Sequence, residues 1–382
     1  MVVLEILFWL SAALIVWTHA GYPLALALAA GAAARVRPPR LRAAPGARLP
    51  SLSVIVAAHD EAAVIEARVR NALALDYPRE LLELIVACDG CTDATAALAR
   101  EAGAELVLEL PRAGKIRAQD LAVESAGGEI VAFSDANALW DADAARELVA
   151  AFSDPRVGYA CGAVSFERAG GASNQEGVYW RYELAVRSLE SRLYSITAGN
   201  GAIYATRREA YIVVDPIMGH DLSLPFNMVK RGYRAVYVPS ARAREKMVPS
   251  LAGEFARKRR MMSHTWPIVL RGGMLSPRGY PLSYALMMLS HRVLRYFTPI
   301  LHAIALAANV ALVAEGAGAL YVVTLALQLA LLAAALLAGR VRARPLLIAR
   351  YYVLTTASGA AGLWDWLRHG TVAWWDAAEG TR

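Results

Sequence analysis

The order of apolar and charged positions divides the chain into two apolar ends and a mixed middle. No Asp, Glu, Lys or Arg occurs between Ile6 and Ala34, and this run exceeds the roughly 20 residues that a helix needs to cross a bilayer. We therefore expect one transmembrane helix in residues 1–34, kinked or ended near Pro23. A cleaved signal peptide is the alternative, but the run is too long and no basic leader precedes it.

Apolar runs return beyond residue 272. The short uncharged stretch before Arg292 favours an interfacial helix in residues 273–292. Residues 293–339 contain two longer runs that meet at Glu315, and we expect them to form a transmembrane hairpin. Residues 340–382 are expected to hold a third C-terminal membrane segment and a tail. That segment, residues 345–363, could span the membrane, lie on it or re-enter it, and tryptophans typical of interfaces follow it, namely Trp364, Trp366, Trp374 and Trp375.

In the middle domain, residues 50–272, short apolar runs alternate with helical patterns. Four runs rich in β-branched residues, each bounded by polar turns, are expected to be buried strands. Their alternation with helices predicts a doubly wound α/β sheet with parallel strands. The pattern is looser beyond residue 157, where a strand, a helix and a glycine-rich turn are expected. The four strands are expected at residues 51–57, 82–87, 105–110 and 129–133.

Composition and charge agree with a membrane protein. Hydrophobic residues make up 57% of the 382 residues, and the formal net charge is +7. Arginines gather beside the apolar runs, as in the basic linker of residues 35–49, which suits an anionic membrane surface. No nucleic-acid recognition motif accompanies the charge, so nucleic acid is not an expected partner. Basic flanks favour the cytoplasmic side, where we expect the middle domain to lie.

The three cysteines do not form a disulfide framework, and a reducing compartment is the simpler assumption. Cys88 and Cys91 have the spacing of a redox or zinc pair. One distant third cysteine, Cys161, leaves a zinc ligand set incomplete, so we expect neither role.

Candidate chemistry lies at expected strand ends and helix starts. Asp135 and Asn137 follow the fourth strand and could reach one hard cation that also binds a diphosphate. Ordinary turn formation is the alternative for both residues. Lys115 follows Gly114 at an expected helix start, where it could meet phosphate beside exposed backbone N–H groups. A solvated lysine at a helix end is the alternative there.

Six motifs follow one another across roughly residues 50–270: VIVAAHDE ending at Glu61, DGCTD from Asp89, Gly114-Lys115, SDAN around Asp135, GNGAIYA from Gly199, and His220-Asp221. This ordered set resembles the membrane-bound family 2 glycosyltransferases, which include cellulose, chitin and hyaluronan synthases. The resemblance implies a GT-A fold, a Rossmann-like α/β transferase domain, inserted here between N-terminal and C-terminal transmembrane helices. It also implies a nucleotide-sugar donor, usually a UDP-sugar, Mn²⁺ or Mg²⁺ as cofactor, and inversion at the sugar.

The resemblance assigns roles to individual residues. It makes Asp221 the catalytic base, and a carboxylate is suited to that proton transfer. It places Glu61, Asp89, Lys115 and Asp135 at the nucleotide sugar, with the metal held by Asp135 and Asn137. The structural alternatives are a helix N-cap for Asp221, a first-turn acid for Glu61 and a turn-forming residue for Asp89.

The chain departs from the family pattern at several positions. Asn137 replaces an aspartate, which keeps an oxygen ligand and removes a charge. His220 and Cys88 replace acids, and titration of His220 could alter the pH dependence. Arg260 remains from a Gln-x-x-Arg-Trp motif whose Gln and Trp are absent; it could approach donor phosphate, an anionic acceptor or lipid head groups.

These features predict an inverting hexosyl- or N-acetylhexosaminyltransferase of the bacterial inner membrane, acting in cell-envelope or exopolysaccharide synthesis. Its expected partners are a nucleotide-sugar donor, membrane lipids and a lipid-linked or polysaccharide acceptor, with a partner subunit left open. The missing Trp favours addition of one or a few sugars over processive synthesis, which stays an alternative. A catalytically impaired membrane scaffold is a second alternative, and the large middle domain disfavours a transporter.

Overall fold

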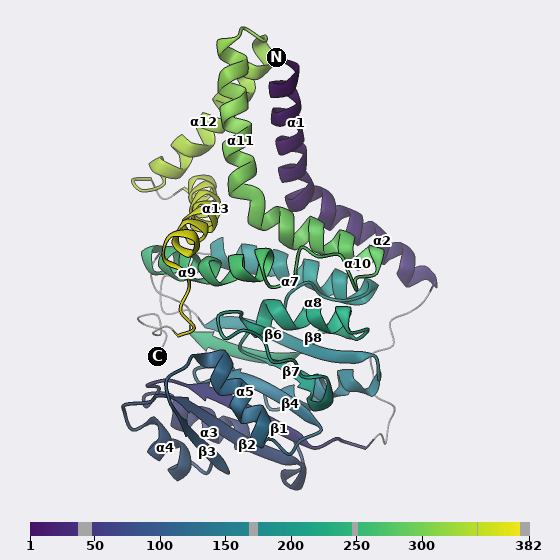
Figure 1. The fold of residues 1–382 in the computed structure, drawn as a ribbon, viewed down its shortest axis with the longest axis vertical. Helices are drawn as coiled ribbons and strands as arrows, with labels where there is room; N and C mark the ends of the chain where they lie inside the picture. The colour runs from purple at the N-terminus through teal and green to yellow at the C-terminus, as the bar shows by residue number, and fades with distance from the viewer. Residues whose placement is uncertain (37–47, 168–174, 247–250, 342, 375–382) are drawn as a thin grey trace.

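The computed structural model describes residues 1–36, 48–167, 175–246, 251–341 and 343–374. Most of the expected basic linker and the tail from Trp375 lie outside these residues. One eight-stranded sheet, ordered β3-β2-β1-β4-β7-β6-β8-β5, forms the centre of the middle domain (Figure 1). Its strands are β1 Leu52–Ala58, β2 Leu82–Asp89, β3 Leu106–Leu110, β4 Ile130–Asp135, β5 Leu139–Trp140, β6 Val157–Glu167, β7 Tyr204–Arg207 and β8 Arg234–Lys246.

Half of this sheet is the parallel arrangement that the alternating pattern predicts. Strands β3, β2, β1 and β4 pair in parallel, whereas β7 runs antiparallel between β4 and β6. Along β1, Val54 and Val56 belong to one core and Ile55 to the core on the opposite face, as expected for a strand buried on both sides. The covering helices are α3 Ile65–Leu73, α4 Thr95–Glu101, α5 Lys115–Ser125, α6 Ala144–Ala150 and α8 His220–Lys230.

Three further helices lie between the sheet and the apolar helices that project from it (Figure 1). They are α7 (Gln175–Leu193), α9 (Leu251–Leu270) and α13 (Arg344–His369). A third apolar core joins them to Tyr22 and Leu26 of the N-terminal segment and to residues 284–293, with Trp266 and Trp366 among its buried members. The middle domain and the apolar helices are therefore packed together through a shared core.

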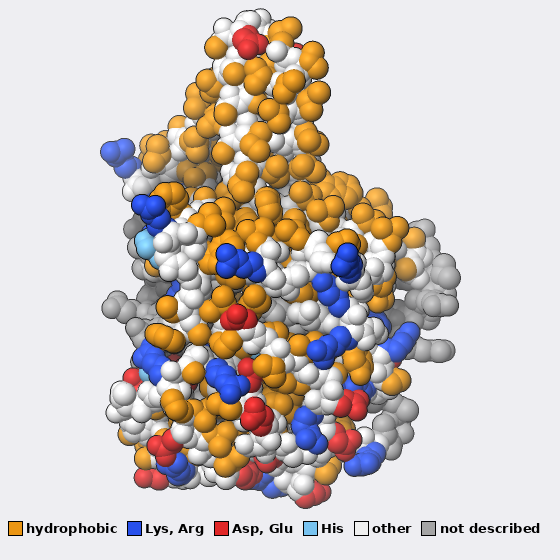
Figure 2. Space-filling view, viewed as in Figure 1, with side chains coloured by type: hydrophobic (Ala, Val, Ile, Leu, Met, Phe, Trp, Pro, Cys, Tyr) orange, Lys and Arg blue, Asp and Glu red, His pale blue; other side chains and the backbone are white. Residues whose placement is uncertain are grey.

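Three helical segments are long and apolar enough to cross a membrane: Val2–Ala33, Leu282–Ala314 and Ala319–Leu337. The second comprises α10 (Leu282–Met287), a π-helical turn η5 (Met288–Val293) and α11 (Leu294–Ala314). The boundary expected at residue 292 thus falls inside one continuous helical segment. The third candidate span is α12 (Ala319–Leu337). Apolar side chains cover the outside of the projecting helices (Figure 2).

Two π-helical turns meet where these helices approach the middle domain. The first, η1 (Trp17–Gly21), separates α1 (Val2–Val16) from α2 (Tyr22–Val36) and lies just before Pro23. Thr18 Oγ1 donates a hydrogen bond of 2.6 Å to the backbone oxygen of Ser290 in η5. Beyond the turn, the Tyr22 hydroxyl donates to Glu190 of α7 over 2.8 Å. α1 packs against α11, whereas α2 packs against α7.

Candidate active site

A cavity of about 480 Å³ begins at the carboxyl end of β4 and reaches the apolar helices. Its sheet end is lined by residues of β4, α5 and α8, and its other end by residues of α9, α11 and α13. Ligands of open α/β sheets bind outside the carboxyl ends of strands. The cavity therefore connects the expected ligand edge of the sheet with the membrane-side helices.

Lys115 and Asp135 form an ion pair at the sheet end of the cavity. Lys115 is the first residue of α5 and follows Gly114, whose φ of 94° is favoured only by glycine. Burial lowers the pKa of Lys115, but the adjacent Asp135 carboxylate raises it further, so the amine is held charged. This arrangement presents a fixed cation at a helix N-terminus, which is favourable for binding phosphate.

Asp221 lies in the same cavity, near the start of α8. Its backbone oxygen accepts a 2.6 Å hydrogen bond from the Gly199 N–H, which ties α8 to the glycine-rich turn before β7. A Cβ at Gly219 would lie 2.6 Å from Asp221 Oδ1, so the carboxylate occupies space that only glycine leaves open. Burial raises the pKa of Asp221, and nearby Lys115 offsets part of that shift. The carboxylate is thus made more basic than a solvated aspartate.

His220 precedes Asp221, lines the same cavity and is 2% exposed, packed against aromatic rings. Its Nδ1 lies 2.8 Å from the Tyr204 hydroxyl and its Nε2 lies 3.3 Å from the Tyr211 hydroxyl. Burial and the charge of Lys115 lower the pKa of His220 to about 3. The imidazole is therefore neutral at physiological pH, and this argues against the sequence hypothesis that it titrates near neutrality.

Asp89, the last residue of β2, contacts the turn that precedes Lys115. Its Oδ1 accepts hydrogen bonds from the backbone N–H groups of Ala113 at 2.6 Å and Gly114 at 3.1 Å. The carboxylate thereby fixes the turn directly before Lys115. Glu61 donates its backbone N–H to Thr95 Oγ1 at 2.8 Å. Neither Asp89 nor Glu61 is among the described residues that line the cavity, whereas Arg260 is.

Glu245, near the end of β8, is a cavity residue that the sequence interpretation missed. Burial and the neighbouring Asp135 carboxylate raise its pKa to about 7. No recognisable motif surrounds it, and the pairing of β8 with β6 and with β5 carries it to this edge of the sheet.

The oxygen ligands near Lys115 fit a hard divalent cation. Asp135 and Glu245 are two carboxylates that repel one another in a half-buried cavity, and a cation between them would relieve that repulsion. Asn137 is half-buried two residues after Asp135, but it is not among the described lining residues. Asp135 and Glu245 both line the cavity, so Glu245 is a candidate ligand for Mn²⁺ or Mg²⁺ beside the expected Asp135 and Asn137.

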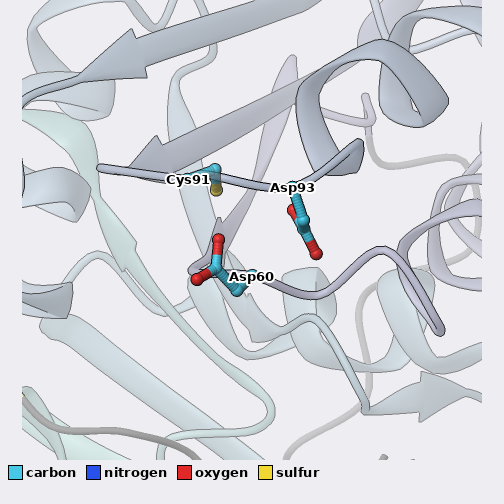
Figure 3. A group of neighbouring side chains, drawn as sticks. All are labelled: Asp60, Cys91 and Asp93. Carbon is cyan, nitrogen blue, oxygen red and sulfur yellow. The ribbon is translucent and has the colours of Figure 1, made fainter.

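A second group of possible ligands lies in the loops after β1 and β2 (Figure 3). Ligand atoms of Asp60, Cys91 and Asp93 lie within 4.8 Å of one another. Asp60 accepts a hydrogen bond of 2.7 Å from the Thr92 N–H, and Asp93 accepts one of 2.9 Å from the Thr95 N–H. These turn contacts explain the position of both carboxylates without a bound metal.

Comparisons with known proteins agree with this geometry. The chain is similar to the solved mannosyltransferase PcManGT from Pyrobaculum calidifontis, in complex with GDP-Man and Mn²⁺, with 26% identity and a TM-score of 0.68 over 95% of this chain and 99% of that chain. It is 26% identical over 215 residues to an N-acetylglucosaminyltransferase of Rhizobium meliloti (strain 1021), covering 50% of each protein. The chain thus spans about half the length of that curated relative.

The predicted GT-A fold is confirmed by the likeness to PcManGT and by the sheet with its flanking helices. Residues 50–263, which contain the expected strands, match the family described as "Glycosyltransferase like family 2". This match covers more than half of the chain. The protein therefore belongs to glycosyltransferase family 2.

Proposed function

We propose that this enzyme moves a sugar, with inversion, from a nucleoside-diphosphate donor to a membrane-associated saccharide or lipid-linked acceptor. The observation that carries the proposal is the single cavity that holds the Lys115–Asp135 pair and Asp221 and continues to the membrane-side helices. The donor would lie at the sheet end. The acceptor would enter from the end formed by α9, α11 and α13.

Asp221 accepts the proton of the acceptor hydroxyl as that oxygen attacks the anomeric carbon. The new glycosidic C–O bond forms as the bond to the donor phosphate breaks, and a nucleoside diphosphate leaves from the opposite face of the sugar. The raised pKa of Asp221 brings its basicity closer to the working pH, which favours general base catalysis. Lys115 stabilises the negative charge that develops on the leaving diphosphate.

Mn²⁺ or Mg²⁺, when bound, would neutralise further charge on the leaving diphosphate. Asp135 and Glu245 would hold the ion, and Asp89 would fix the turn that presents Lys115. The family resemblance favours a UDP-sugar, whereas the GDP-Man in the PcManGT complex supports a GDP-sugar as the alternative. Both nucleotides therefore belong in a donor screen.

We place the catalytic domain, residues 50–272, at the cytoplasmic face of a bacterial inner membrane. Support comes from the three candidate spans on either side of it in sequence and from the arginine-rich flanks. Addition of one or a few sugars is favoured over processive synthesis, because the Gln and Trp of the processive motif are absent around Arg260.

The test is nucleoside diphosphate release by the detergent-purified full chain with manganese and a panel of UDP- and GDP-sugars. We expect one donor to be turned over by the wild type and not by Asp221→Asn. Equal release by both proteins would contradict the role of Asp221. No release from any donor, with lipid-linked acceptors supplied, would favour the scaffold alternative.

A further inference from the structure

The glycine-rich turn before β7, residues 197–201, contacts both parts of the proposed catalytic machinery through its backbone. The Gly199 N–H donates a hydrogen bond of 2.6 Å to the backbone oxygen of Asp221. A Cβ added at Gly201 would lie 3.2 Å from Lys115 Nζ. A shift of this turn would therefore move the start of α8, which carries Asp221, relative to Lys115.

The two residues that lead into this turn are held by side chains from the candidate membrane span Leu282–Ala314. The Tyr284 hydroxyl, in α10, donates a hydrogen bond of 2.9 Å to the Ile196 backbone oxygen. Arg292 Nε, in η5, donates one of 2.9 Å to Thr197 Oγ1. Both donors are buried, so these hydrogen bonds lie in a low-dielectric environment that strengthens them. One helical segment outside the middle domain thus holds two successive residues of that domain.

Thr197 is the residue at which these contacts converge, and its side chain is 0% exposed. Its hydroxyl accepts from Arg292 and donates to Glu190 of α7 over 3.0 Å, while its own N–H donates to the same carboxylate over 3.0 Å. Tyr22 of α2 also donates to Glu190, and His291 Nδ1 lies 2.7 Å from it. The hydrogen bonds around Thr197 therefore join the glycine-rich turn to α2, α7 and η5.

The contact at Thr197 can be separated from the ion pairs of Glu183. Arg292 uses different atoms for the two, because its Nη2 binds Glu183 and its Nε binds Thr197. The ion pairs hold helices against one another, whereas the Thr197 hydroxyl carries a contact to the turn. Removing that hydroxyl therefore changes the support of the turn and leaves both members of each ion pair present.

We propose that Thr197 is a positioning residue for sugar transfer. Through its hydroxyl, η5 fixes the glycine-rich turn, and the turn fixes the start of α8 so that Asp221 faces the acceptor hydroxyl. This inference rests on the proposed transferase function and gives the membrane-side helices a part in it beyond anchoring. Donor binding should depend on this contact far less, because Lys115 and Asp135 are carried by α5 and β4.

The first measurement is hydrogen–deuterium exchange of the full chain in nanodiscs, which needs no turnover. Thr197→Val keeps the shape of the side chain and removes the hydroxyl. It should speed exchange in peptides that contain the Gly199 N–H by ~10-fold or more, because that hydrogen bond then opens more often. Peptides from β1 should keep their exchange rates. Thr197→Ser, which retains a hydroxyl, should keep the wild-type protection.

Thr206→Val is the matched control. This threonine lies on β7 and is also 0% exposed, but its hydroxyl has no hydrogen-bond partner among the described residues. The same chemical change is therefore made in the same sheet without removing a contact to the glycine-rich turn. Thr206→Val should keep the wild-type protection of Gly199.

The second measurement compares nucleotide affinity with turnover of the donor found in the screen. Thr197→Val should lower kcat per nucleotide-binding site by ~10-fold or more, because a small displacement of a catalytic group is costly. Affinity for the nucleoside diphosphate should stay within about twofold of the wild type. A residue with only a structural role would lower the number of binding sites and leave the rate per site unchanged. Thr197→Ser should recover most of the rate, and Thr206→Val should keep it.

Unchanged exchange at Gly199 in Thr197→Val overturns the proposal, and so does an unchanged rate per site. Equal losses in Thr206→Val also overturn it, because they would follow from the loss of any buried hydroxyl. If Thr197→Val does not fold, Tyr284→Phe decides, since it removes only the hydroxyl that binds Ile196 and should lose the same protection. If the wild type turns over no donor, the transferase function fails, while faster exchange that Thr197→Ser reverses still supports the positioning of the turn.

Discussion

The two ends of the cavity hold charge in different ways. At the sheet end, Lys115 and Asp135 come from a helix start and a strand end of the α/β pattern, and their pair is 24% and 30% exposed. At the membrane end, Glu183 of α7 binds Arg292 and Arg295, which lie more than 100 residues away in sequence, and the three side chains are 5%, 7% and 10% exposed. At the sheet end, Lys115 and Asp135 can give up their ion pair to bind a ligand. At the membrane end, the ion pairs of Glu183 hold α7 against the helical segment that contains Arg292 and Arg295.

The largest expected effect comes from changing the proposed catalytic base at the sheet end of the cavity. Asp221→Asn should lower the rate of sugar transfer by ~10² to 10⁴-fold, because an amide cannot accept the hydroxyl proton. Donor affinity should change little, so the effect appears in kcat. The exposed Asp143→Asn serves as the control and should keep the wild-type rate. A transfer rate within threefold of the wild type would remove Asp221 from the mechanism.

At the membrane end, Glu183→Gln should affect stability rather than nucleotide binding. It leaves Arg292 and Arg295 buried without their shared carboxylate, and breaking a buried ion pair costs about 3 to 5 kcal/mol of unfolding free energy. The thermal midpoint in detergent should fall, while nucleotide affinity of the folded protein is retained. Glu124→Gln, an exposed change on α5, should leave the midpoint unchanged. An unchanged midpoint in Glu183→Gln would mean that the cluster does not join the helices.

The next prediction concerns the residues at the sheet end that are proposed to bind the metal ion. Asp135→Asn should weaken manganese binding by ~10-fold or more, because the ligand loses its charge. Glu245→Gln should have an effect in the same direction, and Asn137→Ala a smaller one. Manganese titration followed by electron paramagnetic resonance measures this without turnover. A larger loss in Asn137→Ala than in Glu245→Gln would restore the ligand set that the sequence suggests.

The smallest expected effect concerns His220. Its pKa is about 3 when folded, against an ordinary value of 6.5, so only the unfolded chain gains a proton as the pH falls below 6.5. Stability should therefore decrease on acidification, by about 1 kcal/mol between pH 6.5 and 5.5. His220→Gln should lose this dependence and keep the wild-type rate–pH profile near neutrality. A shifted rate profile in His220→Gln would return the histidine to the catalytic machinery.

The local sequence pattern was enough to predict the strands and the charged residues at the sheet end of the cavity. Apolar runs at the predicted positions became β1, β2, β3 and β4, and the polar residues after them gave Lys115 and Asp135. Glu245 could not be found this way, because it reaches the site through the pairing of β8 with β6. Glu183 could not be found this way either, because its partners Arg292 and Arg295 come from a segment more than 100 residues later in the chain. Such residues acquire their role from packing.

The π turn at Trp17–Gly21 makes the N-terminal segment sensitive to the deletion of a residue. Each residue of a helix turns it by about 100°, so the widened turn resets the rotational phase between α1 and α2. This phase lets one helix face α11 while the other points Tyr22 at Glu190. Deleting a single residue there would leave the helix apolar and long enough to cross a bilayer. It would nonetheless rotate one half away from its partner, so insertion would survive while docking of the catalytic domain would not.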